Sequence, residues 1–173
     1  MSTSPKTLSP RLCRKWPRKA QSEDLKQAFT DHLEETKGQI KRLDKIFKLL
    51  GRKASGKECP AMKGLVQETE EFMGETQSDE VRDAGLIGCA QAVEHYEMAR
   101  YGTLKAWAEQ LEMDDAAALL EETLDEEEAA DEKLTELAMS GLNEAADDGR
   151  KGDEDEEDDN EDEDDNKKRK KKK

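Results

Sequence analysis

The sequence predicts an all-α protein built as a bundle of long helices. In its central part, apolar residues recur at intervals of three and four, which is the period of an amphipathic helix. No segment alternates apolar and polar residues with the period of two that a half-buried strand requires. Hydrophobic residues make up 33% and charged residues 42% of the 173 positions. This apolar share lies below the roughly 45–50% of an ordinary globular chain, so a large β core is not expected.

The first predicted helix spans residues 23–50. Ser22 can cap its N-terminus and Gly51 can end it. A link rich in glycine and lysine follows, and Pro60 then begins a short helix that ends near Gly74. The length of this second helix suits a cap or a crossover. The apolar stripe of the first helix comprises Leu25, Phe29, Leu33, Thr36, Ile40, Leu43, Phe47 and Leu50.

Two further long helices complete the central part. One begins at Ser78 and is about 30 residues long, and the other begins near Asp114 and ends by about Asn143. Together with the first helix they make three members of a bundle, and a fourth member would normally complete the burial of their apolar stripes. We therefore expect one wall of the bundle to be missing.

Both ends of the chain differ from the centre in composition. Residues 1–20 contain three of the four prolines and six basic residues without an acid, which predicts a disordered basic arm. Residues 144–173 run from acidic to basic and end in KKRKKKK, with no apolar residue from 147 onward, which predicts a disordered tail. The expected organisation is therefore an arm, a helical domain at 21–143 and a tail.

Charge and cysteine content exclude several classes of protein. The net charge is −15, and residues 21–146 carry 30 acids against 14 bases, so nucleic acid is not expected as a partner and any ligand there should be cationic. The three cysteines include no C-x-x-C pair, which argues against a disulfide framework or a zinc site and fits a reducing cytoplasm. No signal h-region and no apolar run of 18 residues occurs, so no membrane association is expected.

Acidic residues interrupt the apolar stripes of the two later long helices. On the helix that begins at residue 78, steps of three and four place Glu94 and Glu97 at inward positions. On the last helix, the apolar stripe continues through either Glu127 or Glu128 and then Asp131. Of these acids, we expect Glu128 and Asp131, one helical turn apart, to point inward.

The first helix carries a matching polar line of His32, Glu35 and Gln39 at the edge of its apolar stripe. Burying an uncompensated carboxylate is costly, so carboxylates that converge from several helices either become protonated or hold a cation. A site rich in carboxylate and poor in sulfur favours iron or manganese over structural zinc. Tyr101 is expected either to hydrogen-bond a ligand carboxylate or to be an ordinary core tyrosine.

Known di-iron bundles use a Glu from each of two helices and Glu-x-x-His from the other two, whereas Asp131 stands where the histidine would be. Alternatively, the acids lie on solvated faces, since a shift of one residue rotates a helix face by about 100°. His95, about 100° from Glu94, is expected at the surface or as an outer contact. No P-loop, G-x-S-x-G or dinucleotide fingerprint occurs, so any enzymatic activity would belong to the metal.

Four stretches of the chain resemble the YciF-type ferritin-like family of bacterial stress proteins. The similarity covers about residues 21–143, and HLEET, VEHYE and YGTL occur in the order and spacing of the family. The four stretches are LKQAFTDHLEETKGQIKRLDKIF, CPAMKGLVQE, VRDAGLIGCAQAVEHYEMARYGTLKAWAEQL and AALLEETLDEEEAADEKLTELA. The resemblance implies a ferritin-like bundle, a homodimer, a cytoplasmic stress setting and a di-metal carboxylate site related to that of rubrerythrin. It places the candidate ligands at Glu35, Glu94, Glu97, Glu128 and Asp131, with His32 and Gln39 as further candidates.

Members of this family usually begin with another helix, whose Asp-Ala-Glu stretch supplies an inward carboxylate, and residues 1–20 contain no such stretch. We expect these residues to be an out-of-frame reading or a mis-set start. The predicted function is a ferritin-like stress protein with a di-iron or di-manganese site, for which oxygen- or peroxide-consuming reactivity is a hypothesis. The rival is a metal-free helical dimer that acts as an interaction or structural protein, and an architectural nucleic-acid binder ranks last.

Overall fold

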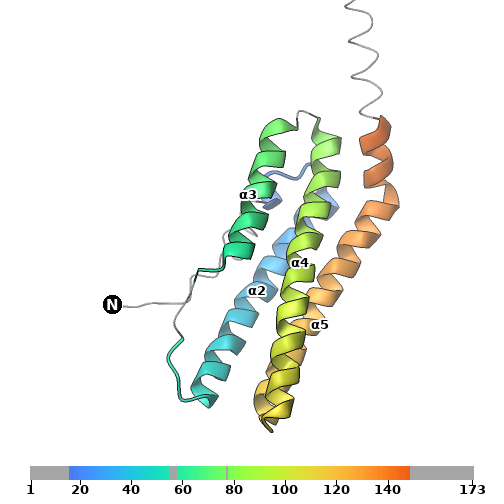
Figure 1. Cartoon of the computed structure of the whole chain (residues 1–173). Coiled ribbons are helices and arrows are strands. Elements are labelled where there is room, and N and C mark those ends of the chain that lie inside the picture. The colour runs from blue at the N-terminus through green and yellow to red at the C-terminus, as the bar shows by residue number, and fades with distance from the viewer. Residues whose placement is uncertain (1–15, 55–57, 77, 149–173) are drawn as a thin grey trace, which may run out of the picture.

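The computed structural model describes residues 16–54, 58–76 and 78–148, and within these ranges it contains helices and no strand (Figure 1). The predicted all-α bundle is therefore confirmed. In order, the elements are η1 (Trp16–Arg18), α2 (Glu23–Leu49), α3 (Pro60–Glu75), α4 (Asp79–Gln110), α5 (Asp114–Leu137) and a π-helical turn, η2 (Ala138–Leu142). None of these helices is both long and apolar enough to cross a membrane.

The predicted helix starts are confirmed to within a few residues: Ser22 is the expected N-cap, and Ser78, predicted only as the start of its helix, is an N-cap as well. Ser22 Oγ accepts a hydrogen bond from the backbone N–H of Leu25, and Ser78 Oγ accepts one from Val81, each at 3.4 Å. These bonds satisfy N–H groups that the first turn of a helix leaves unpaired. Gly51 follows the end of α2 with a φ of +63°, a left-handed conformation that favours glycine and reverses the chain.

Three long helices and one short helix form the bundle. α4 and α5 pack as an antiparallel pair, α2 packs against α5, and α3 packs against α4 (Figure 1). α3 has 16 residues against 32 in α4 and covers only the N-terminal half of that helix. Gly85 permits the close approach, because a Cβ atom there would lie 1.9 Å from Cζ of Phe72. In the described part of the chain, the fourth wall is thus shorter than the other three, which have 27, 32 and 24 residues.

Two apolar clusters form the core, one toward each end of the bundle. The first includes Leu25, Phe29 and Leu86, and the second is centred on Ala108 and Leu120. Between them lies a buried polar layer, contributed by α2, α4 and α5. Its members are His32, Thr36, Gln39, Glu94, Thr123 and Glu127. The apolar clusters separate this layer from solvent at both ends of the bundle.

The buried face of α2 is rotated by one residue from the predicted stripe. Leu25, Phe29 and Thr36 are buried as expected, but the remaining buried positions are His32 and Gln39. The predicted inward residues Leu33, Ile40, Leu43 and Phe47 are only half-buried, and Leu50 is exposed. α2 packs mainly against α5 and η1. Among the described residues, no helix packs along the whole length of α2 on the side where Leu33, Ile40, Leu43 and Phe47 lie. This corrects the predicted orientation of α2.

Residues 16–20, which were expected in a disordered arm, belong to the helical domain. Trp16 is 4% exposed, and its ring centroid lies 5.3 Å from that of Phe29. Asp83 is buried and accepts hydrogen bonds from the backbone N–H groups of Gln21 at 2.9 Å and Ser22 at 2.7 Å, which anchors the chain before α2. At the other end, residues 143–148 are helical, and the rest of the predicted arm and tail lies outside the described residues.

Candidate metal centre

One histidine and two glutamates meet in the polar layer. His32 comes from α2, Glu94 from α4 and Glu127 from α5. His32 Nε2 lies 3.5 Å from Oε1 of Glu94 and 3.8 Å from Oε2 of Glu127, and the three side chains are 8%, 3% and 0% exposed. One ligand atom from each residue lies within 4.8 Å of the other two. Each long helix therefore contributes one potential metal ligand at the same level of the bundle.

Helical periodicity explains the placement of Glu127. It stands seven residues after Leu120 and seven before Leu134, and both leucines are buried. Residues seven apart lie on one face of a helix, so the face that buries the two leucines also buries the carboxylate. In the same way, Glu94 follows the buried Ala90 by one helical turn on α4.

Several predicted site residues lie in or beside this cluster. His32 and Glu94 belong to it directly. Glu35 lies on the outer side of His32, with Oε2 3.4 Å from Nδ1, and its side chain is 45% exposed. Glu97 lies next to Glu127, and its Oε2 atom is buried. The structure therefore groups four of the six predicted residues around Glu127.

The other two predicted residues lie elsewhere. Glu128 is exposed. Asp131 is partly buried and faces the surface of α4, where its Oδ1 lies 3.2 Å from Nε2 of His95 and accepts a hydrogen bond from Gln91 at 3.1 Å. The buried acid of α5 is the neighbouring Glu127, whose spacing of seven from leucines on both sides was the sequence signal that could have identified it.

Burial shifts the protonation of these carboxyl groups. It raises the pKa of Glu97 to about 8, with the charge of Glu127 as a second cause. Burial also raises the pKa of Glu94, and burial together with the charge of Glu94 raises the pKa of Glu127. The pKa of Tyr101 is raised by burial and then by the charge of Glu97. Within the part of the chain that the structure describes, the buried oxygens Oε2 of Glu94, Oε2 of Glu97 and both carboxylate oxygens of Glu127 accept no hydrogen bond.

The free energy of unfolding of the metal-free protein should therefore contain a component that falls as pH rises. Glu97 has a folded pKa of about 8 against 4.5 for the ordinary carboxyl, so between these values the folded state binds more protons than the unfolded state. The resulting stabilisation is fully present below 4.5 and is lost as pH rises through 8. Urea unfolding from pH 5 to pH 9 measures this dependence. In Glu97→Gln, the unfolding free energy should fall less steeply with pH than in the natural chain. Equal slopes would contradict this assignment.

Arg42 pairs with acids outside the cluster. Arg42 on α2 forms ion pairs with Glu126 and with Glu122, the latter at 3.0 Å, and these contacts raise its pKa. Its Nη1 atom also donates to Glu126 Oε2 at 2.7 Å. This network joins α2 to α5 but engages the acids beside Glu127 rather than Glu127 itself.

The donor set fits a transition-metal cation. Two ligand atoms that each lie about 2.1 Å from an ion are about 3.0–3.4 Å apart, so the 3.5 Å between His32 Nε2 and Glu94 Oε1 needs little closure. Imidazole and carboxylate groups are both ligands of first-row transition-metal ions. The carboxylate oxygens without hydrogen bonds would gain partners in a bound cation. Fold and site thus define a helical-bundle protein with a buried carboxylate and histidine cluster.

The chain belongs to the family described as "Domain of unknown function (DUF892)", whose family model matches residues 11–147. Protein YciF from Escherichia coli (strain K12) is 49% identical over 138 residues, which are 79% of this chain and 83% of that protein. These matches confirm the YciF-type resemblance of the sequence.

Solved structures agree with this assignment. The crystal structure of the E. coli stress protein YciF matches with a TM-score of 0.74 and 50% identity, covering 78% of this chain and 85% of that one. YcfI from Rhodopseudomonas palustris, described as a structural protein, matches with a TM-score of 0.72 and 51% identity, covering 73% and 80%. The four-helix architecture is thus shared with YciF-type proteins.

Proposed function

We propose that this protein is a YciF-like stress protein that binds iron or manganese through His32, Glu94, Glu97 and Glu127, with a pair of ions as the full complement. The observation that carries the proposal is the convergence of His32, Glu94 and Glu127 from three helices in a buried layer. Glu97 joins the proposed ligands because it lies next to Glu127 and its Oε2 atom is buried. The buried Glu94 and Glu127 and the partly buried Glu97 have no compensating basic group other than His32 within the described residues, and a cation supplies the missing charge. With Glu35, four carboxylates balance the four positive charges of two divalent ions.

The residues around the ligands have supporting roles. His32 presents Nε2 to the cluster while its Nδ1 faces Glu35, an arrangement that selects the tautomer and orientation of a metal-binding imidazole. The two apolar clusters exclude water from the ends of the site. When bound, a pair of such ions supplies redox chemistry toward dioxygen or peroxide, which fits a cytoplasmic stress setting.

A titration tests metal binding directly. Metal-free protein is titrated with Mn²⁺ while electron paramagnetic resonance reports the free ion. We expect saturable binding by the natural chain and binding at least about 100-fold weaker for His32→Ala, because a ligand contributes more than the 10- to 100-fold of an outer contact. Replacing the exposed His95 by Ala should leave binding unchanged. Equal Mn²⁺ affinity of the His32 and His95 variants would overturn the proposed site.

The rival function, a metal-free interaction protein, is favoured by one observation. Leu104, Trp107 and Leu111 are 40%, 62% and 68% exposed on the part of α4 that α3 does not cover, and Leu49 and Leu50 at the end of α2 are also exposed. Exposed apolar side chains of this size are typical of protein interfaces. We propose that this end of the bundle associates in a homodimer, whether or not metal is bound.

Light scattering after size-exclusion chromatography tests this association. The natural chain should have the molar mass of a dimer, whereas the double substitution Leu104→Lys and Leu111→Lys should give the mass of a monomer, because it buries two charges in the interface. Met139→Lys changes an exposed apolar residue on η2 and serves as the control. A monomeric natural chain would contradict the proposed dimer.

A further inference from the structure

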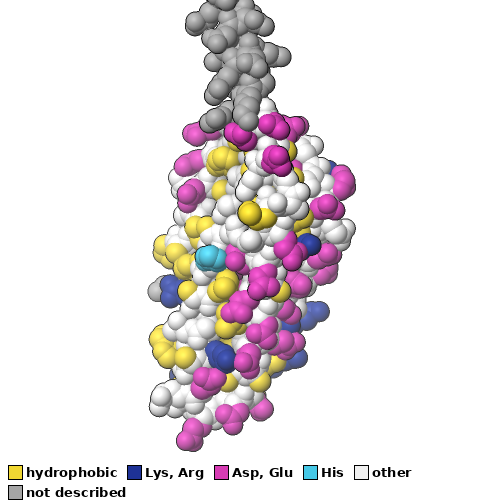
Figure 2. Space-filling view, turned by 90° about the vertical axis from the view of Figure 1, so that its right-hand side faces the viewer, with side chains coloured by type: hydrophobic (Ala, Val, Ile, Leu, Met, Phe, Trp, Pro, Cys, Tyr) yellow, Lys and Arg dark blue, Asp and Glu magenta, His cyan; other side chains and the backbone are white. Residues whose placement is uncertain are grey.

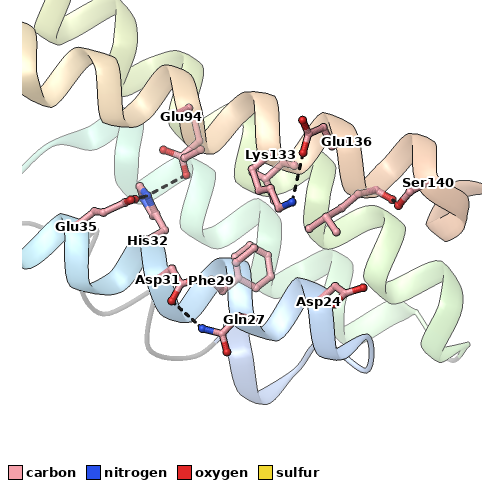
Figure 3. Close-up of a pocket in the computed structure, with 15 residues that line it drawn as sticks. Asp24, Gln27, Phe29, Asp31, His32, Glu35, Glu94, Lys133, Glu136 and Ser140 are labelled. Carbon is pink, nitrogen blue, oxygen red and sulfur yellow. Dashed lines mark hydrogen bonds and ion pairs between the residues drawn. The ribbon is translucent and has the colours of Figure 1, made fainter.

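A groove between α2 and α5 connects the buried cluster to the surface. It has a volume of about 670 Å³ and reaches inward to His32 and Glu94 (Figure 3). Phe29, Leu134 and Leu137 contribute an apolar wall from these two helices. The apolar clusters close the bundle above and below the polar layer. Among the described residues, the groove is therefore an opening through which solvent meets the site.

The charges that line the groove are mainly negative. Five carboxylates contribute to its lining, from Asp24, Asp31, Glu35, Glu94 and Glu136. The single ammonium group, that of Lys133, lies 3.3 Å from Glu136, so the two largely cancel (Figure 3). Acidic side chains also gather along one side of the molecular face seen in Figure 2, which views the bundle from the side of α5. A cleft lined by one sign of charge concentrates ions of the opposite sign.

The inner end of the groove contains a group that requires a partner. Glu94 lines the groove, is 2% exposed, and its Oε2 atom accepts no hydrogen bond. Glu35 stands between this buried carboxylate and solvent, since it is 45% exposed yet lies 3.4 Å from His32. Asp31 also lines the groove, is exposed, and accepts a hydrogen bond from Gln27 at 2.7 Å (Figure 3). Carboxylates thus follow one another from the surface to the cluster.

We infer that divalent cations reach the buried cluster through this groove, and that Asp31 and Glu35 are the carboxylates they meet before Glu94. The inference rests on the proposed metal-binding function. A hydrated cation must lose its water before it enters a buried layer, and successive carboxylate oxygens replace that water along the way. Glu35 then has two roles, because it also faces Nδ1 of His32. It is a positioning residue and the last contact before the cluster.

Rapid mixing with Co²⁺, monitored by the visible absorption of the bound ion, distinguishes residues of the entry route from residues of the binding site. A route residue changes the rate of binding, whereas a site residue changes the affinity. The Asp31 side chain accepts a hydrogen bond from Gln27, which is not a proposed ligand, so Asp31→Asn should lower the association rate constant by about three- to tenfold at low salt and change the equilibrium affinity much less. Glu35→Gln should lower both. Glu75→Gln removes an exposed carboxylate from α3, which does not line the groove, and should change neither.

A steric variant tests the same route without changing charge. Ala130 lines the groove, and Ala130→Phe should slow Co²⁺ association and dissociation by similar factors, leaving the affinity unchanged. If the natural chain binds Co²⁺ and both Asp31→Asn and Ala130→Phe bind it at the natural association rate, the proposed route is wrong but the proposed function stands. Absence of Co²⁺ binding to the natural chain overturns the proposed function and the route with it.

Discussion

Replacing Glu127 by Gln is expected to abolish metal binding and to stabilise the metal-free protein. Glu127 has no exposed surface, and its two carboxylate oxygens have no hydrogen-bond donor among the described residues. A neutral amide loses the charge that a cation needs, so affinity for Mn²⁺ should fall by at least about 100-fold. The same change removes an uncompensated buried charge, so the unfolding free energy at pH 9 should rise by about 1–3 kcal/mol. Metal titration and urea unfolding measure the two effects.

The adjacent Glu128 provides a matched control. It is exposed, so Glu128→Gln should change the unfolding free energy by less than about 0.5 kcal/mol and leave metal affinity intact. In the rival account, in which the acids form hydrogen bonds between helices, Glu127→Gln would destabilise the protein or have no effect. A stability loss in Glu127→Gln, or weaker metal binding in Glu128→Gln, would contradict the site.

Trp16→Ala should have the largest effect on stability of any change outside the buried polar layer. Trp16 is 4% exposed and packs against Phe29 within the apolar cluster near the start of α2. Truncating a buried tryptophan leaves a large cavity and typically costs about 3–5 kcal/mol. Against the 5–15 kcal/mol of a typical domain, such a loss is large. Urea unfolding of the full chain measures it.

Two further variants serve as controls for Trp16→Ala. Trp16→Phe retains a ring and should lose less stability than Trp16→Ala, whereas Met139→Ala removes a side chain that is 79% exposed and should be nearly neutral. If Trp16→Ala lowered the unfolding free energy no more than Met139→Ala, residues 16–20 would not be part of the folded core. The prediction from composition, a disordered arm, would then be correct for these residues.

The helices could be predicted from sequence because their signals are local. Apolar spacing, Ser22 and Ser78 as N-caps, Pro60 in the first turn and Gly51 beyond the end of α2 all act within a few residues. The position of residues 16–20 could not be predicted in this way. Prolines and basic residues are typical of an arm, and the burial of Trp16 depends on Phe29, which lies a full turn beyond the start of α2.

The level of the buried polar cluster was predicted, but the identity of its members was predicted only in part. A polar turn in each long helix indicated the correct layer, and His32 and Glu94 are in the cluster. Glu127 and Glu128 differ by a rotation of about 100° around the helix axis. In the sequence, only the more distant Leu120 and Leu134 indicate which of the two points inward. The orientation of a face is a tertiary property, because it depends on which neighbour the helix packs against.

The metal content of the protein purified without a histidine tag tests the central claim most directly. Inductively coupled plasma mass spectrometry of the natural chain, after growth with iron and manganese, should find close to two ions of these metals per chain. The double substitution Glu94→Gln and Glu127→Gln should contain almost none. A folded natural chain that contains neither metal, and takes up neither when both are supplied to the purified protein, would contradict the account.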